Sequence, residues 1–63
     1  MKFRSMTLLQ KKKLLRDEYI KDGAEESFVD ELVPSGYLPD DLASVDARLK
    51  DVFGYKDETE VLS

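Results

Sequence analysis

The sequence contains no cysteine and no histidine, and each absence removes a class of chemistry. Without cysteine there is no disulfide framework, no thiolate for a zinc site and no thiol nucleophile. Without histidine there is no side chain that exchanges protons near neutral pH by default. The adjacent acids Asp40–Asp41 and Glu25–Glu26 do not replace it, because neighbouring helix positions do not face each other. We therefore expect a protein that is not an enzyme and has no catalytic residues.

Glycine occurs only three times, always singly, so the sequence has no glycine-rich phosphate loop. Asp40, Asp41 and Asp46 do not alternate around a central glycine as calcium ligands do, and we expect neither metal nor cofactor. No stretch approaches the ~20 consecutive apolar residues that span a bilayer. The apolar run Met6–Leu9 is also shorter than the roughly 7–15 apolar residues of a signal peptide. We expect no membrane partner and a cytoplasmic location, which the lack of cysteine fits.

Charged residues make up 38% of the chain and are divided unevenly along it. Residues 1–16 hold six basic residues and no acid, whereas residues 17–63 hold four basic residues and all fourteen acids. The two segments therefore carry net charges of +6 and −10. Such a division is typical of a basic arm that binds a partner. It is also expected when the two segments pack side by side and neutralise each other, which is the interpretation we favour.

The clearest helical pattern lies at residues 39–53. Four apolar residues recur there in steps of three and four, which places them on one stripe of a helix: Leu42, Val45, Leu49 and Val52. Pro39 suits the first helical position, and the two acids after it suit the positive end of the helix dipole. Gly54 suits a left-handed C-terminal cap. We expect the core to be built on this stripe.

Two further helices are expected, at residues 6–22 and 25–33, after a frayed start at residues 1–4. Strong helix formers dominate the first helix, with Ser5 or Thr7 as its N-cap and Gly23 as its end. Pro34 ends the second, whose apolar strip consists of Phe28, Val29, Leu32 and Val33. The sequence therefore predicts an all-α fold: a small three-helix domain over residues 1–55, followed by a mobile polar tail over residues 56–63.

An alternative arrangement begins with a strand from Lys2 to Leu8, followed by two helices. That order occurs in dimeric ribbon-helix-helix DNA-binding proteins, and Gly23 between the helices would fit it. Only Phe3 and Thr7 favour a strand there, and the alternation of apolar and polar residues fails at Leu8. We therefore prefer the three-helix arrangement.

The first helix carries a basic run, which consists of Lys11, Lys12, Lys13 and Arg16. This run is the best candidate for a functional surface. Nucleic-acid phosphates bind such runs, with an affinity that falls steeply with salt. Against this, the whole chain is acidic, and it offers no asparagine and one glutamine for reading base edges. We prefer pairing of the run with acids of the same chain or of a protein partner.

The apolar surface of the first helix is too wide for one neighbour, because Leu9, Leu14 and Ile20 cannot all point the same way. Exposed apolar surface of this breadth usually marks a contact site. The candidate partner-binding residues are Lys11, Lys12, Lys13, Arg16, Leu9, Leu14 and Ile20. We expect a small adaptor or regulatory protein, of the accessory, inhibitor or antitoxin-like kind, that binds another protein or a second copy of itself. The alternative is a small DNA-binding regulator that uses the basic N-terminal segment.

Overall fold

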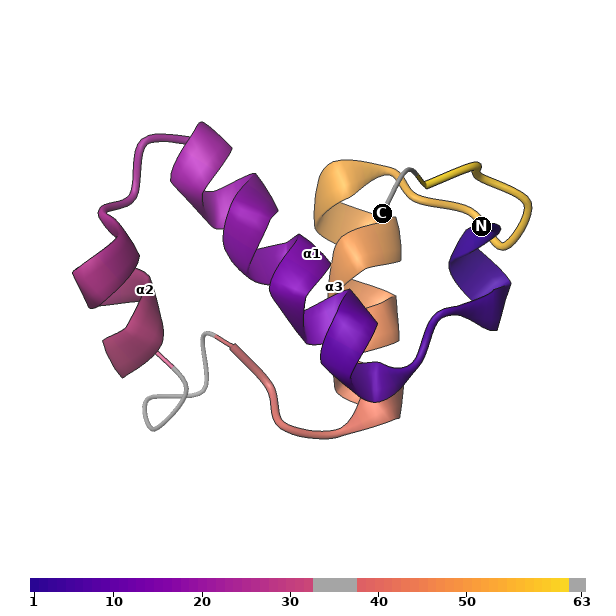
Figure 1. Ribbon diagram of the computed structural model, residues 1–63, viewed down its shortest axis with the longest axis horizontal. Helices are drawn as coiled ribbons and strands as arrows, with labels where there is room; N and C mark the ends of the chain where they lie inside the picture. The colour runs from indigo at the N-terminus through magenta and orange to yellow at the C-terminus, as the bar shows by residue number, and fades with distance from the viewer. Residues whose placement is uncertain (33–37, 62–63) are drawn as a thin grey trace.

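The computed structural model describes residues 1–32 and 38–61, and helices are its regular elements (Figure 1). A single 3-10 turn, η1 (Phe3–Ser5), precedes three α-helices, which are α1 (Leu8–Lys21), α2 (Glu26–Glu31) and α3 (Leu42–Phe53). The described residues contain no strand; Lys2 makes only an isolated bridge with Glu60. The all-α, three-helix prediction is therefore confirmed, and the alternative with an N-terminal strand is wrong.

Helix α1 begins two residues later than predicted because of its N-cap. The Thr7 hydroxyl accepts a hydrogen bond from the Gln10 N–H at 3.2 Å, and the Gln10 side chain accepts one from the Thr7 N–H at 2.8 Å. This reciprocal capping box leaves Met6 in extended geometry, outside the helix. The predicted stop is confirmed: Gly23 follows the helix with a φ of 106°.

Helix α3 begins at Leu42, three residues later than predicted, because Asp41 is its N-cap. The Asp41 carboxylate accepts a hydrogen bond from the Ser44 N–H at 2.8 Å, and this bond holds the pKa of Asp41 below 3.8. Pro39 and Asp40 therefore lie ahead of the helix. At the other end Gly54 has a φ of 76° and forms the predicted left-handed cap.

Helix α2 is shorter than predicted and ends at Glu31. Of its expected apolar strip, Val29 and Leu32 are buried, whereas Phe28 is 56% exposed. Val33, Pro34 and the rest of the predicted turn lie outside the described residues.

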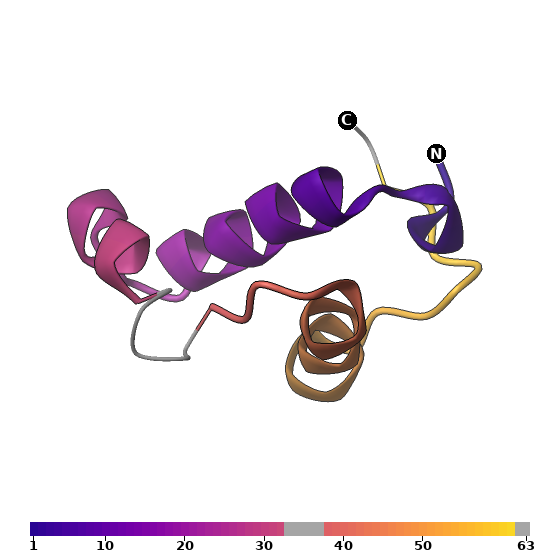
Figure 2. The same ribbon diagram turned by 90° about the horizontal axis from the view of Figure 1, so that it is seen from below.

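Helix α1 is the central element: α3 crosses one of its faces and α2 lies at its C-terminal end (Figure 2). The buried apolar side chains come from η1, from all three α-helices and from the segment between α2 and α3, and they are Phe3, Leu15, Val29, Leu32, Leu38, Val45 and Leu49. The predicted stripe on α3 is only half correct, because Leu42 and Val52 are 49% and 63% exposed. The frayed start is a wrong prediction as well, since Phe3 is fully buried.

The segment after α3 folds back onto the N-terminal residues. The Phe3 N–H donates to the Thr59 carbonyl at 2.8 Å, and the Val61 N–H donates to the Met1 carbonyl at 2.8 Å. Residues 56–61 are therefore packed against the domain. The mobility expected for residues 56–63 stays a prediction, and residues 62 and 63 lie outside the described residues.

Candidate interaction surface

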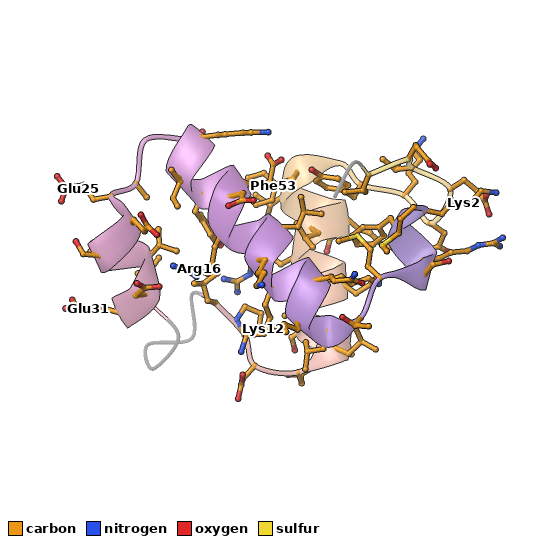
Figure 3. The ribbon with its side chains drawn as sticks, in the orientation of Figure 1. Lys2, Lys12, Arg16, Glu25, Glu31 and Phe53 are labelled. Carbon is orange, nitrogen blue, oxygen red and sulfur yellow. The ribbon has the colours of Figure 1, made fainter. Side chains whose placement is uncertain are left out.

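Most of the basic run on α1 is paired with acids from the same chain. Three basic residues of α1 form ion pairs with acids of later segments: Lys11 with Asp46, Lys12 with Asp40, and Arg16 with Asp30. Figure 3 shows Arg16 between α1 and α2, and Lys12 reaching toward the segment that precedes α3. These three residues, predicted to bind a partner, therefore already have partners within the molecule.

The basic residues ahead of α1 follow the same pattern. Lys2 and Arg4 lie 2.7 Å and 3.0 Å from the carboxylate of Glu58. Exposed pairs of this kind contribute little stability individually, because water screens them. Together they confirm that the basic and acidic segments pack side by side.

Lys11 belongs to the interior rather than to the surface. The residue is only 5% exposed, and its Nζ lies 4.2 Å from the centroid of the Phe3 ring. Its Nζ is 2.5 Å from Asp46, which also accepts a contact from Lys50 at 3.1 Å. Burial raises the pKa of Asp46, but the hydrogen bonds from Lys11 and Lys50 outweigh it and hold that pKa below 3.8. Sequence reasoning missed this role because Lys11 looks like one member of a surface run.

The face of α1 that points away from α3 is covered by no other described element (Figure 2). Leu9 is 63% exposed and Ile20 is 37% exposed. They are three helical turns apart and therefore lie on one stripe. Lys13 and Asp17, also exposed, lie next to this stripe, and neither has an ion-pair partner among the described residues. We call this face, with Leu9, Lys13, Asp17 and Ile20, the outer face of α1.

A hollow of about 350 Å³ adjoins the outer face. Its apolar lining brings together four side chains from distant parts of the chain, namely Met1, Met6, Leu14 and Val61. The polar lining comes from α1 alone and consists of Gln10, Lys13 and Asp17. The hollow and the outer face share Lys13 and Asp17 and form one continuous surface.

The seven predicted contact residues therefore divide into two groups. Leu9, Lys13, Leu14 and Ile20 lie on the outer face or in the hollow, whereas Lys11, Lys12 and Arg16 do not. Met1, Met6 and Val61 were missed. Their positions depend on the contact between the two ends of the described chain, and no periodic pattern in the sequence reports that contact.

The described residues form neither a metal-ion cluster nor a membrane-spanning helix. No three or more acidic side chains among residues 1–32 and 38–61 lie close enough together to hold a metal ion. Within the same residues, no helix has the length and apolar character needed to cross a bilayer. Comparison with protein-family models, curated proteins and solved structures finds no match to this chain.

Proposed function

We propose that this chain is a non-enzymatic, cytoplasmic adaptor or regulatory protein that binds another protein through the outer face of α1. The observation that carries the proposal is the apolar surface formed by the hollow together with Leu9 and Ile20. An apolar patch bordered by polar residues is typical of a protein-binding site. Lys13 and Asp17 supply such a border, with one charge of each sign.

The charge distribution favours a protein over a nucleic acid as the partner. Phosphate binding needs free cations gathered on one face. Lys11, Lys12 and Arg16 instead contact acids of the same chain. The remaining cation of the run, Lys13, stands one helical turn from the negative charge of Asp17. The outer face is therefore better suited to a surface with apolar and mixed-charge groups than to a polyanion.

Site-specific photo-crosslinking in cells that make the protein tests the proposal. A photoreactive residue replaces Leu9 on the outer face or, as a matched control, Val52 on α3, which has the same exposed fraction of 63%. We expect a discrete cross-linked species from position 9 and none from position 52. The same species should disappear when Ile20→Asp is added to the position-9 variant.

Two results would contradict the proposal. One is the absence of any discrete species from position 9. The other is an equal yield from positions 9 and 52, which would show nonspecific capture. A gel-shift titration with duplex DNA at low salt is the complementary test: tight, salt-dependent binding would favour the DNA-binding alternative.

A further inference from the structure

We propose that the outer face of α1 binds a second copy of this chain, with the two α1 helices packed antiparallel around a two-fold axis. This inference rests on the proposed function and names the partner of the same surface. In a two-fold interface each copy uses the same patch, so the patch must be complementary to itself. The outer face meets that requirement in both its charges and its apolar residues.

The charges are self-complementary only in the antiparallel direction. Lys13 and Asp17 lie two positions on either side of Leu15, one helical turn apart. When two copies of α1 run antiparallel with the axis at the level of Leu15, Lys13 faces the partner subunit's Asp17. The symmetric contact brings Asp17 to the partner subunit's Lys13. A parallel pair in register would instead place Lys13 beside the partner subunit's Lys13, which is repulsive.

The apolar residues fit the same arrangement. Leu9 and Ile20 lie almost symmetrically about Leu15, one toward each end of α1. Leu9 therefore comes within one residue, or about 1.5 Å along the axis, of the level of the partner subunit's Ile20. An antiparallel pair has one charged centre and two apolar ends. It covers Leu9 and Ile20, which one copy leaves exposed.

The other cations of the helix do not oppose this pairing. Lys12 and Arg16 are held by Asp40 and Asp30. Lys11 is buried on the side that faces α3. Lys13 is thus the cation of the run that makes no ion pair among the described residues, and the partner subunit's Asp17 would supply one.

The size of the surface sets the expected affinity. Helix α1 has 14 residues and is about 21 Å long. One face of so short a helix is smaller than the ~800 Å² per partner that a stable interface buries. We therefore expect a weak dimer with a dissociation constant on the order of 100 µM.

Sedimentation equilibrium with charge-reversal variants tests the arrangement. Lys13→Asp and Asp17→Lys each place like charges opposite each other twice in the dimer, so each should weaken association by roughly tenfold or more. The double variant Lys13→Asp/Asp17→Lys restores opposite charges and should restore association. Lys56→Asp changes the net charge by the same amount as Lys13→Asp, but away from the outer face, and should leave association unchanged. Circular dichroism confirms that each variant is folded.

The outcomes separate this inference from the proposed function. If the wild-type chain stays monomeric at about 1 mM, roughly ten times the expected dissociation constant, a second copy is not the partner. If position 9 nevertheless cross-links to a different protein, the proposed function stands without the dimer. The antiparallel arrangement is overturned if neither single charge reversal weakens association. It is also overturned if the double variant fails to restore association.

Discussion

The ammonium group of Lys11 joins three segments of the chain. Its Nζ reaches Asp46 of α3 at 2.5 Å and lies 4.2 Å from the ring centroid of Phe3 in η1. A charge taken out of water is tolerated only when it is paired, and Asp46 supplies the pair. The long aliphatic stem meanwhile packs in the interior, as lysine stems commonly do.

Removing the Asp46 carboxylate should destabilise the fold more than removing the Lys11 ammonium group. Asp46→Ala leaves a buried ammonium facing only an aromatic ring, and we expect a loss of about 3 kcal/mol in the free energy of unfolding. This value is at the lower end for a buried pair because the Asp46 side chain is 24% exposed. Lys11→Met keeps the apolar stem, and Asp46 keeps its contact with Lys50, so a smaller loss is expected. Urea unfolding of both variants checks the order; a larger loss for Lys11→Met would contradict the account.

The lowered pKa of Asp46 also predicts how the difference in stability between the wild type and Asp46→Ala depends on pH. The pKa of Asp46 is lowered in the folded state, so its contribution to stability is present above the ordinary value of 3.8. The contribution is lost as the pH falls through the lower folded-state pKa. The gap in stability between the wild type and Asp46→Ala should therefore narrow below about pH 4.

Leu49 and Leu42 lie on the same predicted stripe of α3 but differ in burial. Leu49 is fully buried and Leu42 is 49% exposed. We expect Leu49→Ala to cost about 2–5 kcal/mol, the range for a buried leucine, and Leu42→Ala to cost much less. Because so small a domain has a total stability on the order of 5 kcal/mol, the first variant should be largely unfolded. Thermal melts followed by circular dichroism decide the matter, and equal melts for the two variants would show that the core lies elsewhere.

Tyr55 carries a hydroxyl group that should resist ionisation. Burial and the 2.7 Å hydrogen bond that it donates to Glu18 raise the pKa of Tyr55 to about 12. A folded-state pKa above the ordinary value of 10.0 means that its contribution is complete below pH 10 and is lost between pH 10 and about 12. The free energy of unfolding should fall across that window more steeply in the wild type than in Tyr55→Phe.

Glu18→Gln is the matched control for Tyr55. The amide oxygen can still accept the hydrogen bond from the hydroxyl, but the negative charge is gone. The pKa of Tyr55 should therefore move toward 10.0, which tyrosinate absorbance measures. A tyrosine that titrates identically in both proteins would contradict the assigned cause.

At the level of single elements, the composition determines which segments are helical and the caps determine where the helices begin. Gly23 and Gly54 follow the ends of α1 and α3 as predicted. Both positions have a positive φ, which glycine adopts without steric cost. The starts were predicted too early, because Met6 and Pro39 are compatible with a helix. The side-chain bonds made by Thr7 and Asp41 decide otherwise. Either Ser5 or Thr7 could form such a bond, so the sequence alone did not distinguish them.

The N-cap assignment can be tested directly. Thr7→Ala removes the hydroxyl that accepts from the Gln10 N–H and should cost about 1 kcal/mol. Ser5→Ala, at the other candidate position, should change stability much less because Ser5 lies in η1. Denaturant unfolding of the two variants compares them, and a greater loss for Ser5→Ala would show that α1 begins earlier.

Helical periodicity predicts a face but not what covers it. The stripe on α3 contains two buried and two exposed residues because α1 covers only part of its length. Phe3 completes the core from outside any predicted helix, stacking on Tyr55 with ring centroids 5.4 Å apart. Such a long-range contact leaves no periodic signal in the sequence.

At the scale of the whole molecule, the charge division serves internal packing. The basic first segment contacts acids of the later segment along α1 and at the N-terminal residues. The chain as a whole keeps a net charge of −4, and some of its acids lie exposed at the end of the molecule that α2 occupies. Glu25 and Glu31, for example, point away from the rest of the molecule (Figure 3). The outer face of α1, with one charge of each sign, is electrically distinct from that acidic surface.

The candidate surface was predictable in part. Leu9, Lys13, Leu14 and Ile20 could be named because one helix cannot direct all of them at one neighbour. The hollow beside them could not be predicted, since Val61 reaches it through the hydrogen bond from its N–H to the Met1 carbonyl. That bond joins residues at opposite ends of the described chain.

A dilution series followed residue by residue in amide nuclear magnetic resonance spectra tests the central claim most directly. The protein is diluted from about 1 mM to about 10 µM, a range that spans the expected dissociation constant. The account predicts that the amide signals of Leu9, Lys13, Asp17 and Ile20 shift with concentration, while those around Val52 on α3 do not. Signals that are independent of concentration throughout the chain, or shifts centred on α2 or α3, would contradict it.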